Sequence, residues 1–296
     1  MADPKDQQVD SSMVDALDKT RGESTLALVF QGMLLPLRAF RFLIKHPPLW
    51  LYVLIPALIN IGLFVGGLWV VFSFAEVILE LIWIEPAVEE GWYHWLVTGI
   101  WHVLVTLVAV LTVLASYIFV LLVGGIIASP FNDALSRRVE ALILPEHQRR
   151  EPASSSMIWE TLRAIGSSIF ILGSYCVIMI PILFLNLVPV IGQAAATFLG
   201  AGISSLFLAM EFTDAPLDRR GHGLRRKFEL IEGNRAISLG FGLGSSLLLW
   251  VPFLNFLTIP IAATGGTALG IVLVDWERRE HTTGDTDMSI ERDLSV

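Results

Sequence analysis

The sequence predicts an all-α integral membrane protein with two long transmembrane helices, two re-entrant helical hairpins broken by Pro and Asn, and amphipathic interfacial helices. Of its 296 residues, 54% are hydrophobic and 16% are charged, against roughly 25% charged residues in soluble domains. The mean hydropathy is +0.67. Four stretches contain no Asp, Glu, Lys or Arg: residues 46–75, 91–132, 164–210 and 236–274. Each exceeds the roughly 20 residues that cross a bilayer as a helix, and so small a chain cannot bury four of them in its own interior.

Both ends of the chain are expected to be disordered polar tails, over residues 1–25 and 277–296, on either side of a membrane domain over 26–276. The first 25 residues are rich in Asp and poor in apolar side chains, a composition typical of disorder. They lack the order of basic, apolar and small residues that marks a cleavable signal peptide. We therefore expect the first hydrophobic helix to direct insertion. The single cysteine, Cys176, excludes intrachain disulfides and multi-Cys metal sites.

Residues 26–45 are apolar at helical spacing and carry Arg38, Arg41 and Lys45 close together. This pattern predicts an amphipathic helix at the membrane interface, with its basic residues toward lipid headgroups. The first transmembrane helix is predicted over 49–74, with Asn60 near its start. In that helix Asn60 either bonds a neighbouring helix or lines a pathway.

The segment 73–95 contains five Glu and no Lys or Arg, so the positive-inside rule predicts that it faces away from the cytoplasm, with its Trp residues in an interfacial belt. The second transmembrane helix is predicted over 96–127. Beyond it, Ser129 or Asn132 is expected to cap an amphipathic helix over about 132–144. The Arg-rich segments 129–163 and 211–235 indicate a cytoplasmic location, and we expect both termini there too.

The last two apolar stretches each contain a pair of prolines eight residues apart with one Asn between them. Pro181 and Pro189 flank Asn186, and Pro252 and Pro260 flank Asn255. Proline interrupts a helix because it lacks an N–H and collides with the preceding turn. The arms of about 15 residues cover about 22 Å, less than the roughly 30 Å of the hydrocarbon core. Two re-entrant hairpins are therefore favoured over four full crossings.

Several of these segments resemble one known family, the bacterial CysZ sulfate permeases and the wider EI24 domain family. The resemblance is carried by residues 48–60 (PLWLYVLIPALIN), 127–132 (IASPFN), 188–193 (VPVIGQ), 241–242 (FG), 251–256 (VPFLNF) and Pro260. It implies a helical fold with two long spans and two partly penetrating hairpins, assembly as a homo-oligomer, and uptake of sulfate for cysteine synthesis. It also implies a bacterial inner-membrane location.

The sequence departs from that family at its sulfate-site motif. Where the resemblance implies Gly-Leu-Arg at the start of the first span, this chain has Pro48-Leu49-Trp50. Arg38, Arg41 and Lys45 lie one to three helical turns upstream, and they are our candidates for binding the anion in place of the missing arginine.

A small inorganic anion can also be held by helix ends and backbone N–H groups. Candidates are Ser129 and Asn132 and the hairpin turns that contain Asn186, Gln193 and Asn255, although these side chains could equally cap their own turns. The basic run 219–227 is interpreted as lipid-facing or solvated surface. The expected partners are the lipid bilayer, a sulfate-like anion and further copies of the chain, with no nucleic acid and no cofactor.

No catalytic motif and no metal-ligand spacing of His residues is present in the sequence, so we do not expect an enzyme. Two hypotheses stand: a permease or channel-like protein for sulfate or a related oxyanion, and a non-transporting membrane scaffold or biogenesis protein. The replacement of Gly-Leu-Arg is the feature that motivates the second.

Overall fold

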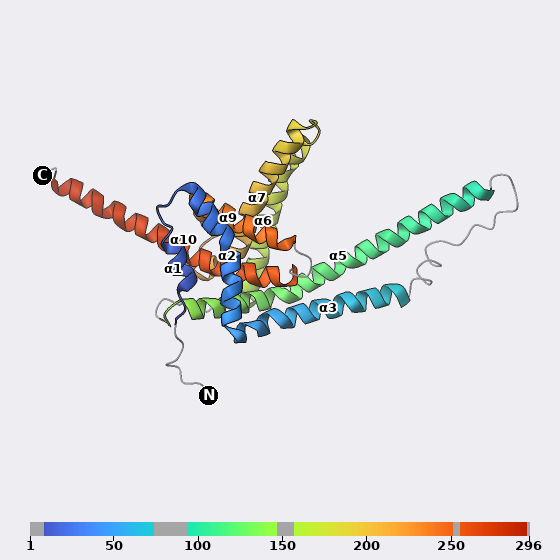
Figure 1. Ribbon diagram of the computed structural model, residues 1–296, viewed down its shortest axis with the longest axis horizontal. Coiled ribbons are helices and arrows are strands. Elements are labelled where there is room, and N and C mark those ends of the chain that lie inside the picture. The colour runs from blue at the N-terminus through green and yellow to red at the C-terminus, as the bar shows by residue number, and fades with distance from the viewer. Residues whose placement is uncertain (1–8, 74–93, 147–156, 251–254, 295–296) are drawn as a thin grey trace. The chain divides into compact units, whose positions relative to one another are not determined.

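The computed structural model describes residues 9–73, 94–146, 157–250 and 255–294, which are helical with short connections and contain no strand (Figure 1). The chain divides into two units, each described here by itself. One unit comprises residues 52–131, and the other comprises residues 1–51 together with 132–296. Of the segment 73–95, predicted to face away from the cytoplasm, residues 74–93 lie outside the described residues, and Trp95 is exposed. The expected Trp belt stays a prediction.

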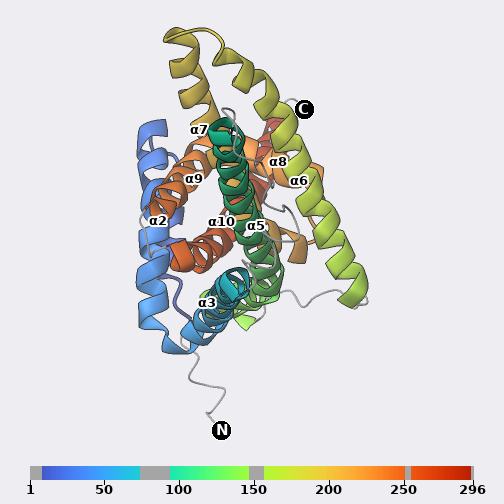
Figure 2. The same cartoon turned by 90° about the vertical axis from the view of Figure 1, so that its right-hand side faces the viewer.

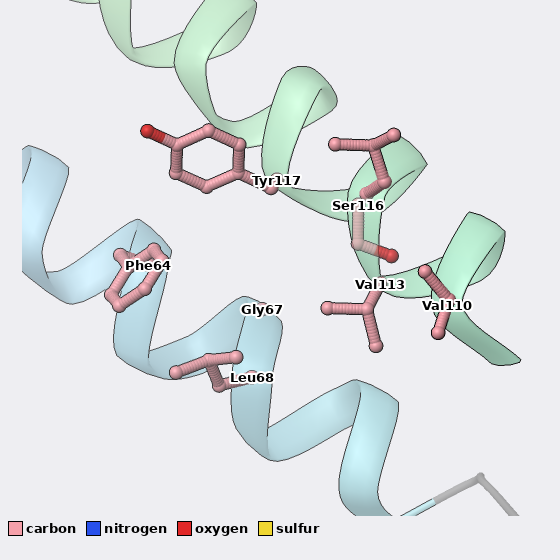
Figure 3. A pocket seen from close by; sticks show the side chains of 8 residues that line it. Phe64, Gly67, Leu68, Val110, Val113, Ser116 and Tyr117 are labelled. Carbon is pink, nitrogen blue, oxygen red and sulfur yellow. The ribbon is translucent and has the colours of Figure 1, made fainter.

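The second unit, residues 52–131, consists of most of α3 (Trp50–Ser73) and the larger part of α5 (His94–Ile143). Both helices contain the predicted spans, and many of their large apolar side chains are exposed, as suits helices surrounded by lipid. Phe64 and Tyr117 meet edge to face, with ring centroids 6.3 Å apart. They line an apolar cavity of about 350 Å³ between the two helices (Figure 3).

The first unit contains all the other helices, in the order α1 (Ser12–Asp18), α2 (Thr25–Lys45), the end of α5, α6 (Met157–Leu185), α7 (Ile191–Arg219), α8 (Leu224–Gly233), α9 (Arg235–Leu249) and α10 (Asn255–Leu294). Helix α9 packs against α2 and α7, and α10 packs against α2, α7 and α9 (Figure 2). Its apolar part is almost entirely buried among them.

Five helices in the described part of the chain are long and apolar enough to cross a membrane: Thr25–Lys45, Pro47–Val70, His94–Ile143, Ile191–Arg219 and Leu257–Arg279. The predicted all-α membrane fold is thereby confirmed. Helix α2, predicted to lie at the interface, belongs to this group.

The first predicted hairpin is formed by α6 and α7, but its break lies later than expected. Pro181 lies inside α6, and the chain turns only at residues 186–190. Val190 has a φ of 64°, which is uncommon for a β-branched residue. Gly192 then packs against the Leu185 carbonyl, where a Cβ atom would collide. The unusual features of the turn therefore lie at Val190 and Gly192, whereas Pro181 is accommodated within α6.

The second predicted hairpin is formed by α9 and α10. Pro252 lies outside the described residues, and Pro260 lies inside α10 rather than at a break. The apolar parts of α6 (Ile169–Leu185) and of α9 are shorter than a full crossing, whereas α7 is long enough. Re-entry of the two hairpins stays a prediction.

Two further expectations differ from the structure. The predicted start of a helix at Ser129 or Asn132 is wrong, because α5 runs through this region, including Pro130, to Ile143. The predicted tails are also partly helical: residues 12–18 form α1, which buries Met13 and Leu17, and α10 continues to Leu294. Burial of these two apolar side chains, four positions apart, accounts for the order in α1.

Helix α9 lies unusually close to its neighbours because three of its glycines lack side chains. A Cβ atom on Gly240 or Gly244 would collide with the α2 backbone at Val29 or Met33. A Cβ atom on Gly242 would collide with the Ser205 carbonyl of α7. This glycine-rich segment is therefore a helix-packing element.

We predict that Gly242→Ala destabilises the protein by about 1–3 kcal/mol, because the new methyl group forces α9 away from α7. The matched control is Gly173→Ala in α6, where nothing lies within 4 Å of the added Cβ atom. There alanine should be neutral or stabilising by up to about 1 kcal/mol. Thermal unfolding in detergent measures both variants, and equal melting temperatures would contradict the packing role of Gly242.

A second prediction concerns the depth of the hairpins. Cysteines at Asn186 and Asn255, placed singly in a Cys176→Ser background, should resist a membrane-impermeant maleimide added to either side of membrane vesicles. A hairpin that crosses the bilayer would instead label from the far side. Glu232→Cys, at the exposed end of α8, is the positive control and should label from one side.

Candidate anion-binding site

Three basic residues of α2 share one helical face and line one pocket. Arg38, Arg41 and Lys45 are spaced by three and four residues, which places their side chains along one stripe of the helix. The pocket has a volume of about 140 Å³ and is completed by Phe42 of α2 and by Ser12 and Met13 of α1. The three predicted anion-binding cations are therefore brought together, and we call this cavity the basic pocket.

The cations of the basic pocket carry few internal partners. Arg38 donates through Nη2 to Gln31 Oε1, while its Nη1 atom is buried and has no hydrogen-bond partner among the described residues. Arg41 and Lys45 are exposed. A buried N–H group without an acceptor is costly, so Arg38 is well suited to donate a hydrogen bond to a ligand oxygen.

Asp10 adjoins the basic pocket. Its N–H donates to the Leu142 carbonyl at 2.9 Å, and its Oδ1 accepts from the Ser12 N–H at 3.2 Å. Its Oδ2 lies 3.9 Å from His46 Nε2. Burial pushes the pKa of the Asp10 carboxyl up, but hydrogen bonds from Ser12 and electrostatic interactions with Lys45 and His46 outweigh this effect and hold the pKa below its ordinary value. Asp10 is therefore ionised at neutral pH.

The α1 wall of the pocket is held in place by α10. Asp18 Oδ1 accepts from Trp276 Nε1 at 3.0 Å, and its Oδ2 accepts from Arg279 Nη1 at 2.9 Å. Arg21 donates to the Trp276 carbonyl at 3.1 Å. Sequence reasoning missed Asp10, Ser12 and α1, because it assigned them to a tail.

Much of the basic run 219–227 is buried, contrary to the interpretation as surface. Arg219 and Arg220 at the end of α7 have side chains only 7% exposed, and they pair with Glu140 of α5, which is equally buried. The distances to Glu140 are 2.9 Å from Arg219 Nη2 and 2.7 Å from Arg220 Nη2. Arg219 also donates to Asp133 at 3.0 Å and to the Ser136 hydroxyl at 2.7 Å. We call these five residues the ionic cluster.

The ionic cluster joins several helices of the first unit. The Ser136 hydroxyl lies 2.7 Å from that of Thr267, on α10. Burial lowers the pKa of the Arg220 guanidinium from its ordinary value, while Glu140 opposes that shift. The cluster is saturated with internal partners, so it serves to position helices rather than to bind an anion.

Lys227 on α8 is buried in the same way. Its side chain is 1% exposed, and Nζ donates to Asp214 at 2.6 Å and to Asp218 at 2.5 Å, both on α7. Burying the Lys227 ammonium without a partner would cost free energy, and the two carboxylates offset that cost by pairing with it. The correction therefore applies to Arg219, Arg220 and Lys227, while Arg225 stays exposed.

The remaining predicted site residues lie outside the basic pocket's lining. Asn186 is exposed and donates to the Leu183 carbonyl at 3.2 Å, so it caps its own turn. Gln193 is exposed in the first turn of α7, and Asn132 lies within α5. Asn255 is the first residue of α10, and its side chain lies outside the described residues.

Asn60 and Ser129 belong to the unit of residues 52–131. Asn60 packs against Gly124 of α5, where a Cβ atom would collide with its Oδ1. That oxygen is buried without a hydrogen-bond partner in the described part of the chain. Ser129 is exposed on α5. Roles for these residues in a pathway stay predictions.

Within the described ranges, no group of three or more His, Cys, Asp or Glu residues is arranged to hold a metal ion. The fold and the site thus define an all-α, multi-pass membrane protein with a basic pocket on one of its helices. The chain belongs to the family described as Sulfate transporter CysZ/Etoposide-induced protein 2.4, whose model matches residues 35–260. The resemblance noted from the sequence motifs is confirmed.

One relative is a protein named Sulfate transporter CysZ from Pectobacterium atrosepticum. It is 29% identical over 233 residues, which cover 77% of this chain and 80% of the relative. The three α2 cations fall inside the range matched by the family model, whereas Asp10 and α1 precede it.

We predict that Glu140→Gln destabilises the protein by about 3–5 kcal/mol, because it leaves two buried guanidinium groups short of negative charge. In thermal unfolding this corresponds to a decrease in melting temperature of roughly 10 °C. Glu232→Gln is the matched control, since Glu232 pairs with Arg235 where both side chains are 66% exposed. Loss of that pair should cost at most about 1 kcal/mol, and equal effects would contradict the structural role of the ionic cluster.

Proposed function

We propose that this protein is a permease or channel-like protein for sulfate or a related small oxyanion, that it works in the bacterial inner membrane, and that it supports sulfur assimilation. The observation that carries the proposal is the basic pocket. Three cations line a cavity of about 140 Å³, and one of them, Arg38, has a buried N–H group with no hydrogen-bond partner among the residues that the structure describes. Membership in the family and the similarity to a protein named as a sulfate transporter support the same function.

The charges of the pocket suit a dianion. Arg38, Arg41 and Lys45 contribute three positive charges and Asp10 one negative charge, which leaves an excess of two. Arginine is well matched to oxyanions because its planar guanidinium can donate two parallel hydrogen bonds. The pocket lies at the end of α2 close to the position of the replaced Gly-Leu-Arg motif, at Pro48-Leu49-Trp50. In our proposal, the α2 cations take over the task of the missing arginine.

We further propose that the chain assembles as a homo-oligomer, that both termini and the basic loops are cytoplasmic, and that it has no catalytic activity. The basic pocket then lies at the cytoplasmic mouth of the pathway. The Arg-rich segments 129–163 and 211–235 support this orientation through the positive-inside rule.

A second candidate function is that of a non-transporting membrane scaffold, and the replaced Gly-Leu-Arg motif favours it. The two candidates make different demands on the α2 cations. A scaffold needs them only as contacts with lipid headgroups, whereas a permease needs them to bind the anion.

Flux measurements distinguish these functions. We predict protein-dependent uptake of radiolabelled sulfate into proteoliposomes, with inhibition by selenate and less by phosphate. Arg38→Gln should weaken uptake at low sulfate concentration by roughly tenfold or more, because a charge-assisted hydrogen bond is lost. Arg41→Gln and Lys45→Gln should have smaller effects, since these exposed side chains act through water.

Arg235→Gln is the control, because Arg235 is an exposed cation paired with Glu232 outside the basic pocket. Its uptake should equal that of the wild type. Absence of protein-dependent flux of every oxyanion tested would contradict the transport function and favour the scaffold.

A further inference from the structure

Asp10 is a negative charge fixed beside the basic pocket. Its backbone is anchored by the hydrogen bond from its N–H to the Leu142 carbonyl, and its carboxylate is anchored by the Ser12 N–H. Ser12 itself lines the pocket. The carboxylate therefore cannot turn away when a ligand enters without losing its hydrogen bond from the Ser12 N–H.

Lys45, which lines the pocket, and His46 both act electrostatically on the Asp10 carboxylate. The His46 Nδ1 atom lies 2.9 Å from the Phe42 carbonyl, which turns Nε2 toward Asp10. Lys45 therefore attracts both the Asp10 carboxylate and any anion that binds among Arg38, Arg41 and Lys45. The anion and Asp10 repel each other.

We propose that Asp10 sets the charge selectivity of the basic pocket: it acts as a fixed negative charge at the rim and disfavours doubly charged oxyanions more strongly than singly charged ones of the same shape. The interaction energy of two charges is proportional to each of them. The repulsion energy between Asp10 and a dianion is therefore twice the repulsion energy between Asp10 and a monoanion in the same position.

This inference rests on the proposed function, because it requires that the pocket binds oxyanions. It adds a residue outside the range matched by the family model and assigns to it a defined effect. The pocket binds sulfate through the excess of positive charge, and Asp10 limits how tightly it does so.

The test compares sulfate with perchlorate, two tetrahedral oxyanions that differ in charge and carry no proton at neutral pH. Purified full-length protein in detergent is titrated with radiolabelled sulfate, and perchlorate affinity is obtained by competition, at pH 7.5 and constant ionic strength. Asp10→Asn removes the charge but keeps the side-chain oxygen that accepts from Ser12. We expect it to raise sulfate affinity several-fold and perchlorate affinity by about the square root of that factor, for example about tenfold against about threefold.

Asp15→Asn is the matched control. Asp15 lies on the same short helix, accepts from the Ser11 hydroxyl at 2.6 Å and does not line the pocket. Its substitution should change neither affinity by more than the experimental error. Asp10→Ala, which removes the same charge by a different side chain, should reproduce the ratio given by Asp10→Asn.

Equal changes for sulfate and perchlorate, or no change for either, would overturn the role of Asp10 while leaving the proposed function intact. If the wild-type protein binds no oxyanion and transports none, the proposed function and this inference both fail.

Discussion

The arrangement of the first unit depends on backbone contact between α9 and the helices on either side of it. Gly240 and Gly244 lie against α2, and Gly242 lies against α7. Side chains of any size would separate these helices, so the absence of a Cβ atom at three alternate positions fixes their distance. The same contact fixes the rotation of α2, because Gly32 on α2 lies against Ile237 and Phe241 of α9.

That rotation determines where the cations of α2 lie. The face of α2 that carries Leu35, Ala39 and Phe42 is buried, and the stripe of Arg38, Arg41 and Lys45 is turned toward α1. Helix α1 is held by Asp18 and Trp276, and thus by α10. The geometry of the basic pocket consequently depends on the packing of α2 against α9, and thus on glycines that do not line the pocket.

Local sequence patterns were sufficient for the helices and for the cations of α2, because helical periodicity and charge are properties of neighbouring residues. They failed for the burial of Arg219 and Arg220, whose counter-ion Glu140 lies about eighty positions earlier in the chain. Local patterns also failed to predict α1, because the surrounding sequence is rich in Asp and resembles a disordered tail. The feature that indicates a helix there is the pair Met13 and Leu17, four positions apart. The prolines were misleading because Pro181 and Pro260 are accommodated inside helices. In the first hairpin the unusual backbone conformation lies at Val190, in the turn at 186–190.

The chain itself offers a comparison that favours a ligand in the basic pocket. Where this protein buries cations for structure, it supplies carboxylates: Arg219 and Arg220 share Glu140, and Lys227 has two aspartates. At the basic pocket three cations line the cavity, and within the described part of the chain Arg38 Nη1 has no acceptor. Internal partners satisfy the ionic cluster, whereas the pocket keeps an excess of positive charge that an anion can neutralise.

The partial exposure of Arg38, Arg41 and Lys45 suits a site that binds and releases an anion better than a site that holds it permanently. Conduction requires that an ion binds strongly enough to enter a site and weakly enough to leave it. Arg41 and Lys45 are exposed, so water screens their attraction for the anion, and only Arg38 offers a buried donor. Under the proposed function, one desolvated hydrogen bond and two screened charges allow a small oxyanion both to bind and to leave, as conduction requires.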